Sequence, residues 1–229
     1  MSPTNIISPA DFDISKVTFG AIKSLDNGSK MVPISYDGAP FRVHTPRMHA
    51  PYGINTSVWD GNNRVEADSS NQSAKLSIDL SFGDYENGPS KLQAFYDMIH
   101  KIQTRLIETG VDNSVTWFKK KHSQDVVEAL MTPMIKMPKD KDKYPPTFKI
   151  SLPMRDGRPL FDTYDASKQE VDFSHIDFKG SEVVVIMRCN GVWLAGGKYG
   201  CTFKAEQVKV YPSTKACLNR LVADDESDY

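Results

Sequence analysis

The sequence lacks any apolar run long enough to cross a membrane as a helix. Its longest run, Val183 to Met187, is far short of the roughly 20 apolar residues that such a helix needs. The N-terminal residues MSPTNIISPADFD lack the basic and apolar segments of a secretory leader. We therefore expect a protein that is neither secreted nor membrane-spanning.

Cysteine is scarce and irregularly placed. Cys189, Cys201 and Cys217 are odd in number and form no Cys-x-x-Cys pair. That pattern favours free thiols in a reducing compartment over a disulfide framework or a zinc site. An intracellular location follows as an expectation.

Residue patterns typical of enzymes are also missing. Gly197-Lys198 has neither the upstream glycine nor the downstream Ser or Thr of a phosphate-binding loop. His44 and His49 have no nearby Cys or acidic partner that would complete a metal site. We therefore predict no catalytic residues, no metal ligands and no cofactor, and a protein that is not an enzyme.

What is present is the composition of one soluble packed domain with an uneven charge distribution. The 229 residues are 39% hydrophobic and 25% charged, with a formal net charge of −1. Four of the 29 acidic residues follow Arg220, the last basic residue, and the rest of the chain has 28 basic and 25 acidic residues, a balance of +3. The acidic residues are therefore concentrated at the C-terminal end.

The first part of the chain has the pattern of a β-meander. The segments 14–23, 30–36 and 40–45 are separated by Asp26-Asn27-Gly28 and Asp37-Gly38, which favour tight hairpin turns. Residues 60–73 are polar and predict a surface loop, and 74–82 alternate apolar and polar residues like a half-buried strand.

The middle of the chain changes to helical spacing. Apolar residues three and four apart predict a helix over 90–110, with Pro89 near its start and Gly110 just past its end. A second helix is expected over roughly 113–131. The lysine- and proline-rich residues 134–146 then predict a solvated loop.

Strand patterns return in the last third. The segments 147–153, 181–189, 191–197 and 201–211 predict strands, with Asn190-Gly191 and Gly196-Gly197 as turns between the last three. A β block, a helical insert and a second β block predict a mainly β fold: an oligonucleotide-binding (OB) Greek-key barrel. We assign this domain to 1–214, with the insert at about 88–146, and an acidic C-terminal tail to 215–229.

Basic and aromatic residues are interleaved in both β blocks, as a nucleic-acid surface requires: cations attract phosphates, and aromatic faces stack on unpaired bases. For Trp193, packing in the core is an equally good interpretation. Arg188 and Lys204 could simply lie on the solvent face of a strand, and Trp117-Phe118 could pack a helix beside solvated lysines at 119–121. The candidate DNA-binding residues are Trp193, Arg188, Lys198, Tyr199, Lys204, Tyr36, Arg42, Arg47 and Tyr52.

The C-terminal residues form a second candidate feature. Clustered acids repel one another and commonly act as interaction tails. Such a tail could occupy a cationic groove until DNA displaces it, or it could serve only solubility. Its residues are Asp224, Asp225, Glu226, Asp228 and the terminal aromatic Tyr229.

Together these features resemble a known family. The stretch GVWLAGGKYGCTFKAEQVKV at 191–210, the β–helix–β order and the tail ADDESDY at 223–229 resemble the single-stranded DNA-binding proteins of nucleocytoplasmic large DNA viruses. Those proteins are similar in turn to the replication-type binding proteins of tailed phages. The resemblance is sharpest over 181–229.

The resemblance implies an OB-fold protein that covers single-stranded DNA during viral replication, recombination or repair. It also implies a tail that contacts viral replication proteins, possible homo-oligomers, and work in the host cytoplasm or nucleus at sites of viral DNA replication. Two alternatives stay open: a virion or assembly protein whose β domain contacts only proteins, and a β-sandwich ligand-binding module.

Overall fold

The computed structural model describes residues 6–25, 28–60, 63–65, 75–83, 85–87 and 90–213. Several sequence predictions fall partly or wholly outside these residues. They are the turn at 26–28, the polar loop at 60–73, Pro89 at the helix start, Cys217, and the acidic tail with Asp224, Asp225, Glu226, Asp228 and Tyr229.

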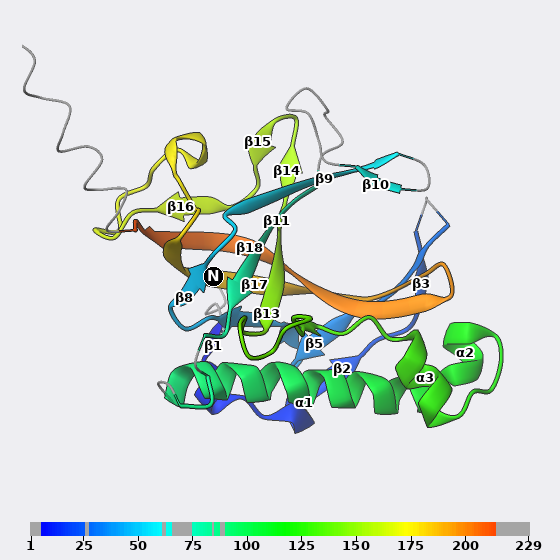
Figure 1. The fold of residues 1–229 in the computed structure, drawn as a ribbon. Coiled ribbons are helices and arrows are strands. Elements are labelled where there is room, and N and C mark those ends of the chain that lie inside the picture. The colour runs from blue at the N-terminus through cyan, green and yellow to red at the C-terminus, as the bar shows by residue number, and fades with distance from the viewer. Residues whose placement is uncertain are drawn as a thin grey trace, which may run out of the picture.

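Two long antiparallel strands, β17 (Ser181–Ala195) and β18 (Lys198–Tyr211), form the centre of the main sheet (Figure 1). Over most of their length both strands alternate buried and more exposed residues, and the alternation is interrupted at 191–192 in β17 and at 199–201 and 206–207 in β18. Each therefore has one face toward the core and one toward the outside.

Among the described residues, five strands close a ring of pairings. They are β8 (Met48–Ala50), β11 (Lys75–Ser81), β13 (Thr147–Leu152), β17 and β18. β8 pairs with β11, β11 with β13, β13 with β18, β18 with β17, and β17 again with β8. Around the ring the strands follow one another as β8, β11, β13, β18 and β17. In the sequence these are the first, second, third, fifth and fourth strands of the five, and the pair of the third and fifth, β13 and β18, is parallel. This is the five-stranded barrel of the OB fold.

Shorter strands extend this barrel. β7 (Arg42–His44) lies beside β17 on the side away from β18, and β16 (Asp162–Tyr164) pairs with β18 in parallel. β4 (Lys30–Val32) pairs with β17 near the tip of the long hairpin. The other strands are β1 (Ile6–Ile7), β2 (Val17–Phe19), β3 (Lys23–Ser24), β5 (Ile34–Tyr36), β6 (Ala39–Pro40), β9 (Ile54–Asp60), β10 (Asn63–Val65), β12 (Ile135–Lys136), β14 (Met154–Arg155) and β15 (Arg158–Pro159).

The predicted long helix is confirmed as α1 (Ser90–Asp112), which runs along one side of the barrel (Figure 1). The prediction that Gly110 follows the helix is wrong, because the helix continues to Asp112. A Cβ at Gly110 would lie 2.9 Å from Cγ1 of Val127. The glycine thus permits close packing of α1 against the next helices and does not end α1.

The second predicted helix is wrong as a single element. It is divided into α2 (Ser114–Phe118) and α3 (Gln124–Leu130). Lys119 caps α2 in the left-handed conformation, with a φ of 62°. That backbone conformation turns the chain and cannot continue a right-handed helix.

The predicted turn at Asn190-Gly191 is also wrong, because β17 runs through it. Cys189 pairs with Phe203 of β18 and Gly191 pairs with Thr202, so Asn190 is the extra residue of a β-bulge. Gly191 has a φ of 96°, and a Cβ there would lie 2.5 Å from the carbonyl oxygen of Val32. The turns at Asp37-Gly38 and Gly196-Gly197 are confirmed, all four residues having positive φ.

The core fills the barrel and the space between the barrel and α1. Phe95 of α1 connects the helix to the barrel through ring contacts. Its ring centroid lies 5.8 Å from that of Phe82 and 5.5 Å from that of Phe148. All three side chains are buried. The fold is therefore mainly β with a helical insert, as the sequence predicts.

Candidate nucleic-acid interface

Three cations lie side by side on the outer face of the barrel. Strand pairing sets Arg42 of β7 opposite Arg188 of β17, and Arg188 opposite Lys204 of β18. The same line continues to Ser151 of β13 and Ser77 of β11. We call Arg42, Arg188 and Lys204 the cationic row.

One carboxylate holds the two arginines of the row. Nε of Arg42 donates to Oε2 of Glu206 at 2.6 Å, and Nη1 of Arg188 lies 3.9 Å from Oε1. All three side chains remain partly exposed to solvent. Glu206 therefore fixes the arginine side chains and neutralises part of their charge.

Lys204 completes the row without such a partner. It is half-buried beside Arg188, and no acidic side chain within 4.0 Å of its ammonium is found among the described residues. Its charge is thus available to an anion from outside. Positive charge along neighbouring strands is what a phosphate backbone requires.

Trp193 lies further along the outer face of β17, toward the hairpin tip. It is half-buried, between the buried residues Val192 and Leu194, whose side chains face inward. Its partner across the strand pair is Gly200. The indole is neither a core residue nor fully exposed, and its exposed part is available for stacking on a base.

The hairpin tip borders a hollow of about 740 Å³. Lys30 of β4, Lys119 after α2 and Lys198 of β18 line it, together with Phe118 and Leu194. In an OB fold this tip is the connection between the fourth and fifth strands, one of the loops that bind oligonucleotides. The predicted residue Lys198 thus shares its site with two further lysines.

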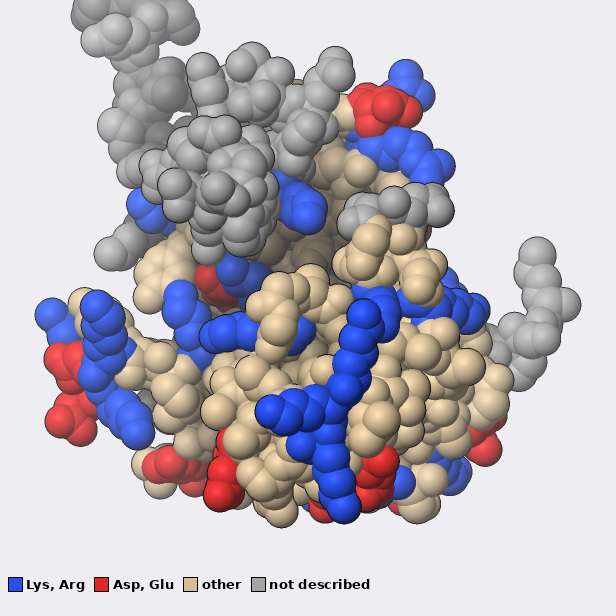
Figure 2. Space-filling model, turned by 90° about the vertical axis from the view of Figure 1, so that its right-hand side faces the viewer, with Lys and Arg blue, Asp and Glu red and all other residues tan. Residues whose placement is uncertain are grey.

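Figure 2 shows the side of the molecule to which this tip belongs. Lysine and arginine side chains gather across the middle of this face, while acidic side chains lie mainly toward its edges. The local charge therefore differs from the near-zero charge of the whole chain. Such a surface attracts an anionic polymer.

Two predicted stacking residues are corrected by the structure. Tyr199 is fully buried against Trp117 and Phe118, with ring centroids 6.0 Å and 5.2 Å away. Tyr36 is buried in a stack with Phe12 and Phe41. Both tyrosines are core residues, because each side chain points to the inner face of its strand.

Two other predicted residues lie at the opposite end of β17. Arg47 makes an ion pair with Glu182 and stands 4.0 Å over the ring of Tyr211. At about 3.3 Å per residue, Glu182 is roughly 35 Å along the strand from Trp193. Tyr52 is 57% exposed and lies in the turn after β8. β8 pairs with β17 at residues 181–183, at the same end of β17 as Glu182. The structure does not bring Arg47 and Tyr52 to the cationic row.

Sequence reasoning missed Lys30 and Glu206. Glu206 follows Lys204 by two residues in the same strand, and this spacing is the signal that could have placed it beside the cations. Lys30 carried no comparable signal, because its neighbourhood depends on the pairing of β4 with β17.

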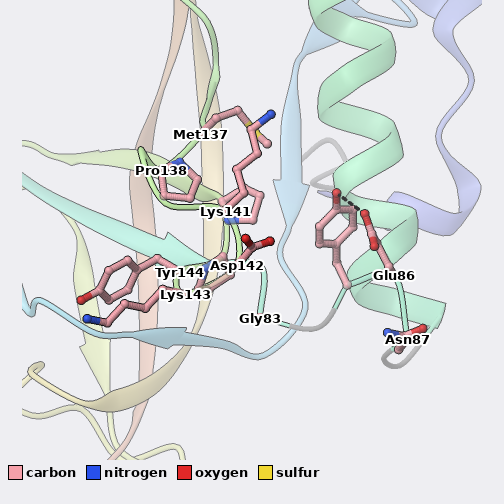
Figure 3. Close-up of a pocket in the computed structure, with 12 residues that line it drawn as sticks. Gly83, Glu86, Asn87, Met137, Pro138, Lys141, Asp142, Lys143 and Tyr144 are labelled. Atoms are coloured by element: carbon pink, nitrogen blue, oxygen red, sulfur yellow. Dashed lines mark hydrogen bonds between the residues drawn. The ribbon is translucent and has the colours of Figure 1, made fainter.

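A separate hollow of about 330 Å³ lies between Gly83, Tyr85, Glu86 and Asn87 on one side and the lysine-rich residues 137–146 on the other (Figure 3). There the ammonium of Lys143 stands 5.3 Å over the ring of Tyr144, and Tyr85 donates to Glu86 at 3.0 Å. Asp142 lies between Lys141 and Lys143 and offsets part of their charge. The hollow lies beyond the ends of β11 and β13, away from the cationic row.

The described residues offer neither a metal cluster nor a membrane helix. No group of three or more His, Cys, Asp or Glu in that part of the chain could hold a metal ion. No helix there is long and apolar enough to cross a membrane. Cys189 and Cys201 are free, with sulfurs 3.4 Å apart. The hydrogen bond with Cys189, together with burial, raises the pKa of Cys201, so this thiol stays protonated.

The class of the protein is thus an OB-fold domain with a helical insert and a cationic outer face. Residues 90–219 match a family model described as a family of unknown function, DUF5871, and the chain belongs to that family. No curated protein matches the chain.

Several solved structures are similar to this chain. One is gp2.5, a single-stranded DNA binding protein encoded by bacteriophage T7, with 14% identity and a TM-score of 0.44, over 83% of this chain and 98% of that chain. Another is the single-stranded DNA-binding protein from bacteriophage Enc34 with a C-terminal truncation, with 11% identity and a TM-score of 0.46, over 87% and 96%. The Enc34 protein in complex with ssDNA gives 13% identity and a TM-score of 0.39, over 86% and 96%.

Proposed function

We propose that this chain binds single-stranded DNA without reading its sequence. The observation that carries the proposal is the cationic row, set on three hydrogen-bonded strands of an OB barrel and followed along β17 by the half-exposed Trp193. The row supplies charge to phosphates, and the indole supplies a face to any base. The activity is binding, not catalysis.

The DNA strand would pass from the hollow around the hairpin tip to the outer face, and then along β17 past Trp193 to the row. Lys30, Lys119 and Lys198 would meet phosphates at the tip, and Lys204 with the arginines would meet them at the row. Side chains that contact phosphate and stack on bases do not discriminate between sequences. Coverage of single strands in viral DNA replication, recombination or repair, in the host cytoplasm or nucleus, is the role that the sequence resemblance supports.

The acidic tail belongs to the proposal as a competitor of DNA and a contact for replication partners. The support is its composition, with Asp224, Asp225, Glu226 and Asp228 ahead of the aromatic Tyr229. A tethered peptide acts at an effective concentration that reaches about the millimolar range, so weak affinity for the cationic face would suffice.

The test is a titration of the full chain with a labelled oligonucleotide, once as a single strand and once as a duplex. We expect tighter binding of the single strand, because bases stacked inside a duplex cannot reach Trp193. Equal affinity for the two forms would overturn the proposal. Failure to bind either form would favour a virion or assembly protein.

A further inference from the structure

A second hollow lies on the outer face directly beside the cationic row. It measures about 280 Å³ and is lined by His44, Tyr164, Lys168, Val184, Ile186, Gln207 and Lys209. His44 lies two residues after Arg42 in β7, and Ile186 lies two residues before Arg188 in β17. Residues two apart lie on the same face, about 7 Å from each other. The hollow therefore adjoins the cationic row on the same face of the sheet.

The floor of this hollow is apolar where a solvent-facing strand would be polar. Val184 and Ile186 alternate with the buried residues Val183, Val185 and Met187, so they point outward, yet both are half-buried. The residues that line the hollow with them come from β7, β16 with its following turn, and β18. An apolar floor open to solvent is typical of a surface that takes a ligand.

The wall of the hollow is an aromatic ring held by a rigid turn. Tyr164 ends β16, which pairs with β18 so that Tyr164 lies opposite Lys209. Behind it Oδ1 of Asp165 accepts from the backbone N–H groups of Ser167 and Gln169, at 2.8 Å and 2.9 Å. This turn fixes the place of the ring beside the floor.

The charge around the hollow is nearly balanced, unlike that of the row. Lys168 and Lys209 line it, while Asp162 and Glu170 lie close to Tyr164. Desolvation and these two carboxylates raise the pKa of the Tyr164 hydroxyl, which therefore stays protonated. A balanced, partly apolar site suits an uncharged flat ring better than a phosphate group.

We propose that this hollow is a nucleobase pocket, in which a base of the bound single strand packs between the Val184–Ile186 floor and the Tyr164 ring. The proposal rests on the proposed function, because the cationic row must hold the adjacent phosphates. The Gln207 amide, at the edge of the hollow, offers both a donor and an acceptor to the base. Every base has a flat face, so the pocket takes any base.

The experiment compares full-length variants in titrations with an oligothymidylate over a range of salt concentrations. Tyr164→Ala should weaken binding by roughly 5- to 150-fold, the range for loss of one stacked base. Tyr164→Phe should keep wild-type affinity, because it keeps the ring. The slope of log affinity against log salt should be unchanged in both variants, because Tyr164 contacts no phosphate. Tyr144→Ala is the control: it removes a tyrosine that is 47% exposed and lines the separate hollow at 137–146, and it should bind like wild type.

A photocrosslink locates the base directly. An oligonucleotide that carries 5-iododeoxyuridine should crosslink to Tyr164 on irradiation. If the wild-type chain binds the oligonucleotide, but Tyr164→Ala binds equally well and crosslinks form only elsewhere, the pocket is wrong and the proposed function stands. If the wild-type chain binds no single strand at all, the proposed function fails and the pocket fails with it. Melting curves of each variant show whether the fold is intact.

Discussion

Trp193 lies directly opposite Gly200 in the β17–β18 pair, and its indole occupies the space into which a side chain at position 200 would extend. A Cβ at Gly200 would come within 2.8 Å of Cζ2 of the ring. The glycine thus lets the indole lie close against β18 while part of it stays exposed. Replacement of either residue should disturb the same surface.

Trp193→Ala should weaken binding of single-stranded DNA by about 1–3 kcal/mol, the range for one base–aromatic stack. Because the ring is half-buried, the free energy of unfolding should fall by less than the roughly 3–5 kcal/mol that a core tryptophan contributes. A titration and a melting curve on the same sample give both values. A loss of stability in the core range, with binding lost only as the domain unfolds, would make Trp193 a packing residue.

Glu206→Gln should tighten DNA binding at low salt. The carboxylate holds Arg42 at 2.6 Å and lies 3.9 Å from Arg188, so its neutralisation releases positive charge toward the DNA. The gain should shrink as salt rises, because exposed charges are screened over about 10 Å at 0.1 M ionic strength. Binding weakened by this substitution would mean that the position of the arginines matters more than their net charge.

Tyr199→Phe should leave DNA binding unchanged and should not destabilise the fold. The hydroxyl is buried without a hydrogen-bond partner among the described residues, and burial raises its pKa. Removal of an unsatisfied buried group relieves a cost of about 1–3 kcal/mol. Tyr199→Ala should instead lower the free energy of unfolding by roughly 3–5 kcal/mol, as for other large core residues. Denaturant titrations of the two variants separate these outcomes, and a specific loss of binding in Tyr199→Phe would contradict the assignment to the core.

Removal of residues 223–229 should tighten DNA binding, more so at low salt, if the tail competes for the cationic face. Tyr229→Ala should keep most of that competition, because it keeps all four acids, while it weakens contact with a replication partner. Titrations of the three chains at two salt concentrations make the comparison. A truncated chain that binds DNA no more tightly than the full chain at low salt would leave the tail as a solubilising end.

Much of the fold could be predicted from local sequence patterns. The period of α1, the strand β11 and the glycine pair at the hairpin tip each depend on neighbouring residues, and these three elements are confirmed. The half-burial predicted for β11 is wrong, because its polar residues Ser77, Asp79 and Ser81 are buried as well as its apolar ones. The errors arose where a distant contact decides the local conformation. In the sequence Gly110 looks like the end of a helix and Gly191 like part of a turn. In the structure Gly110 is required because Val127 packs closely against it, and Gly191 because the backbone of Val32 does.

The candidate site was only partly predictable for the same reason. Arg42, Arg188 and Lys204 could be identified as basic strand residues, but their alignment follows from strand register, which no local pattern supplies. Alternation could not say which face of a strand is buried, so Tyr199 was assigned to the wrong one. The hollow beside the row did leave a local sign in the sequence. Residues 183–187 of β17 are apolar on both faces, whereas a strand with one face in solvent would be polar on that face.

If the cationic row contacts the phosphates of a single strand, the salt dependence of binding must change when a lysine of the row is removed, and matched lysine variants measure that change. The wild-type chain, with the six phosphate-binding cations of the proposed function, should give a slope of log affinity against log salt of roughly −4. Lys204→Ala should reduce the magnitude of that slope by about 0.7, the share of one contact to a single strand. Lys101→Ala removes an exposed lysine on α1, away from the row, and should leave the slope unchanged. A flat salt response of the wild-type chain, or equal slopes for wild type and Lys204→Ala, would mean that the cationic row does not contact phosphates.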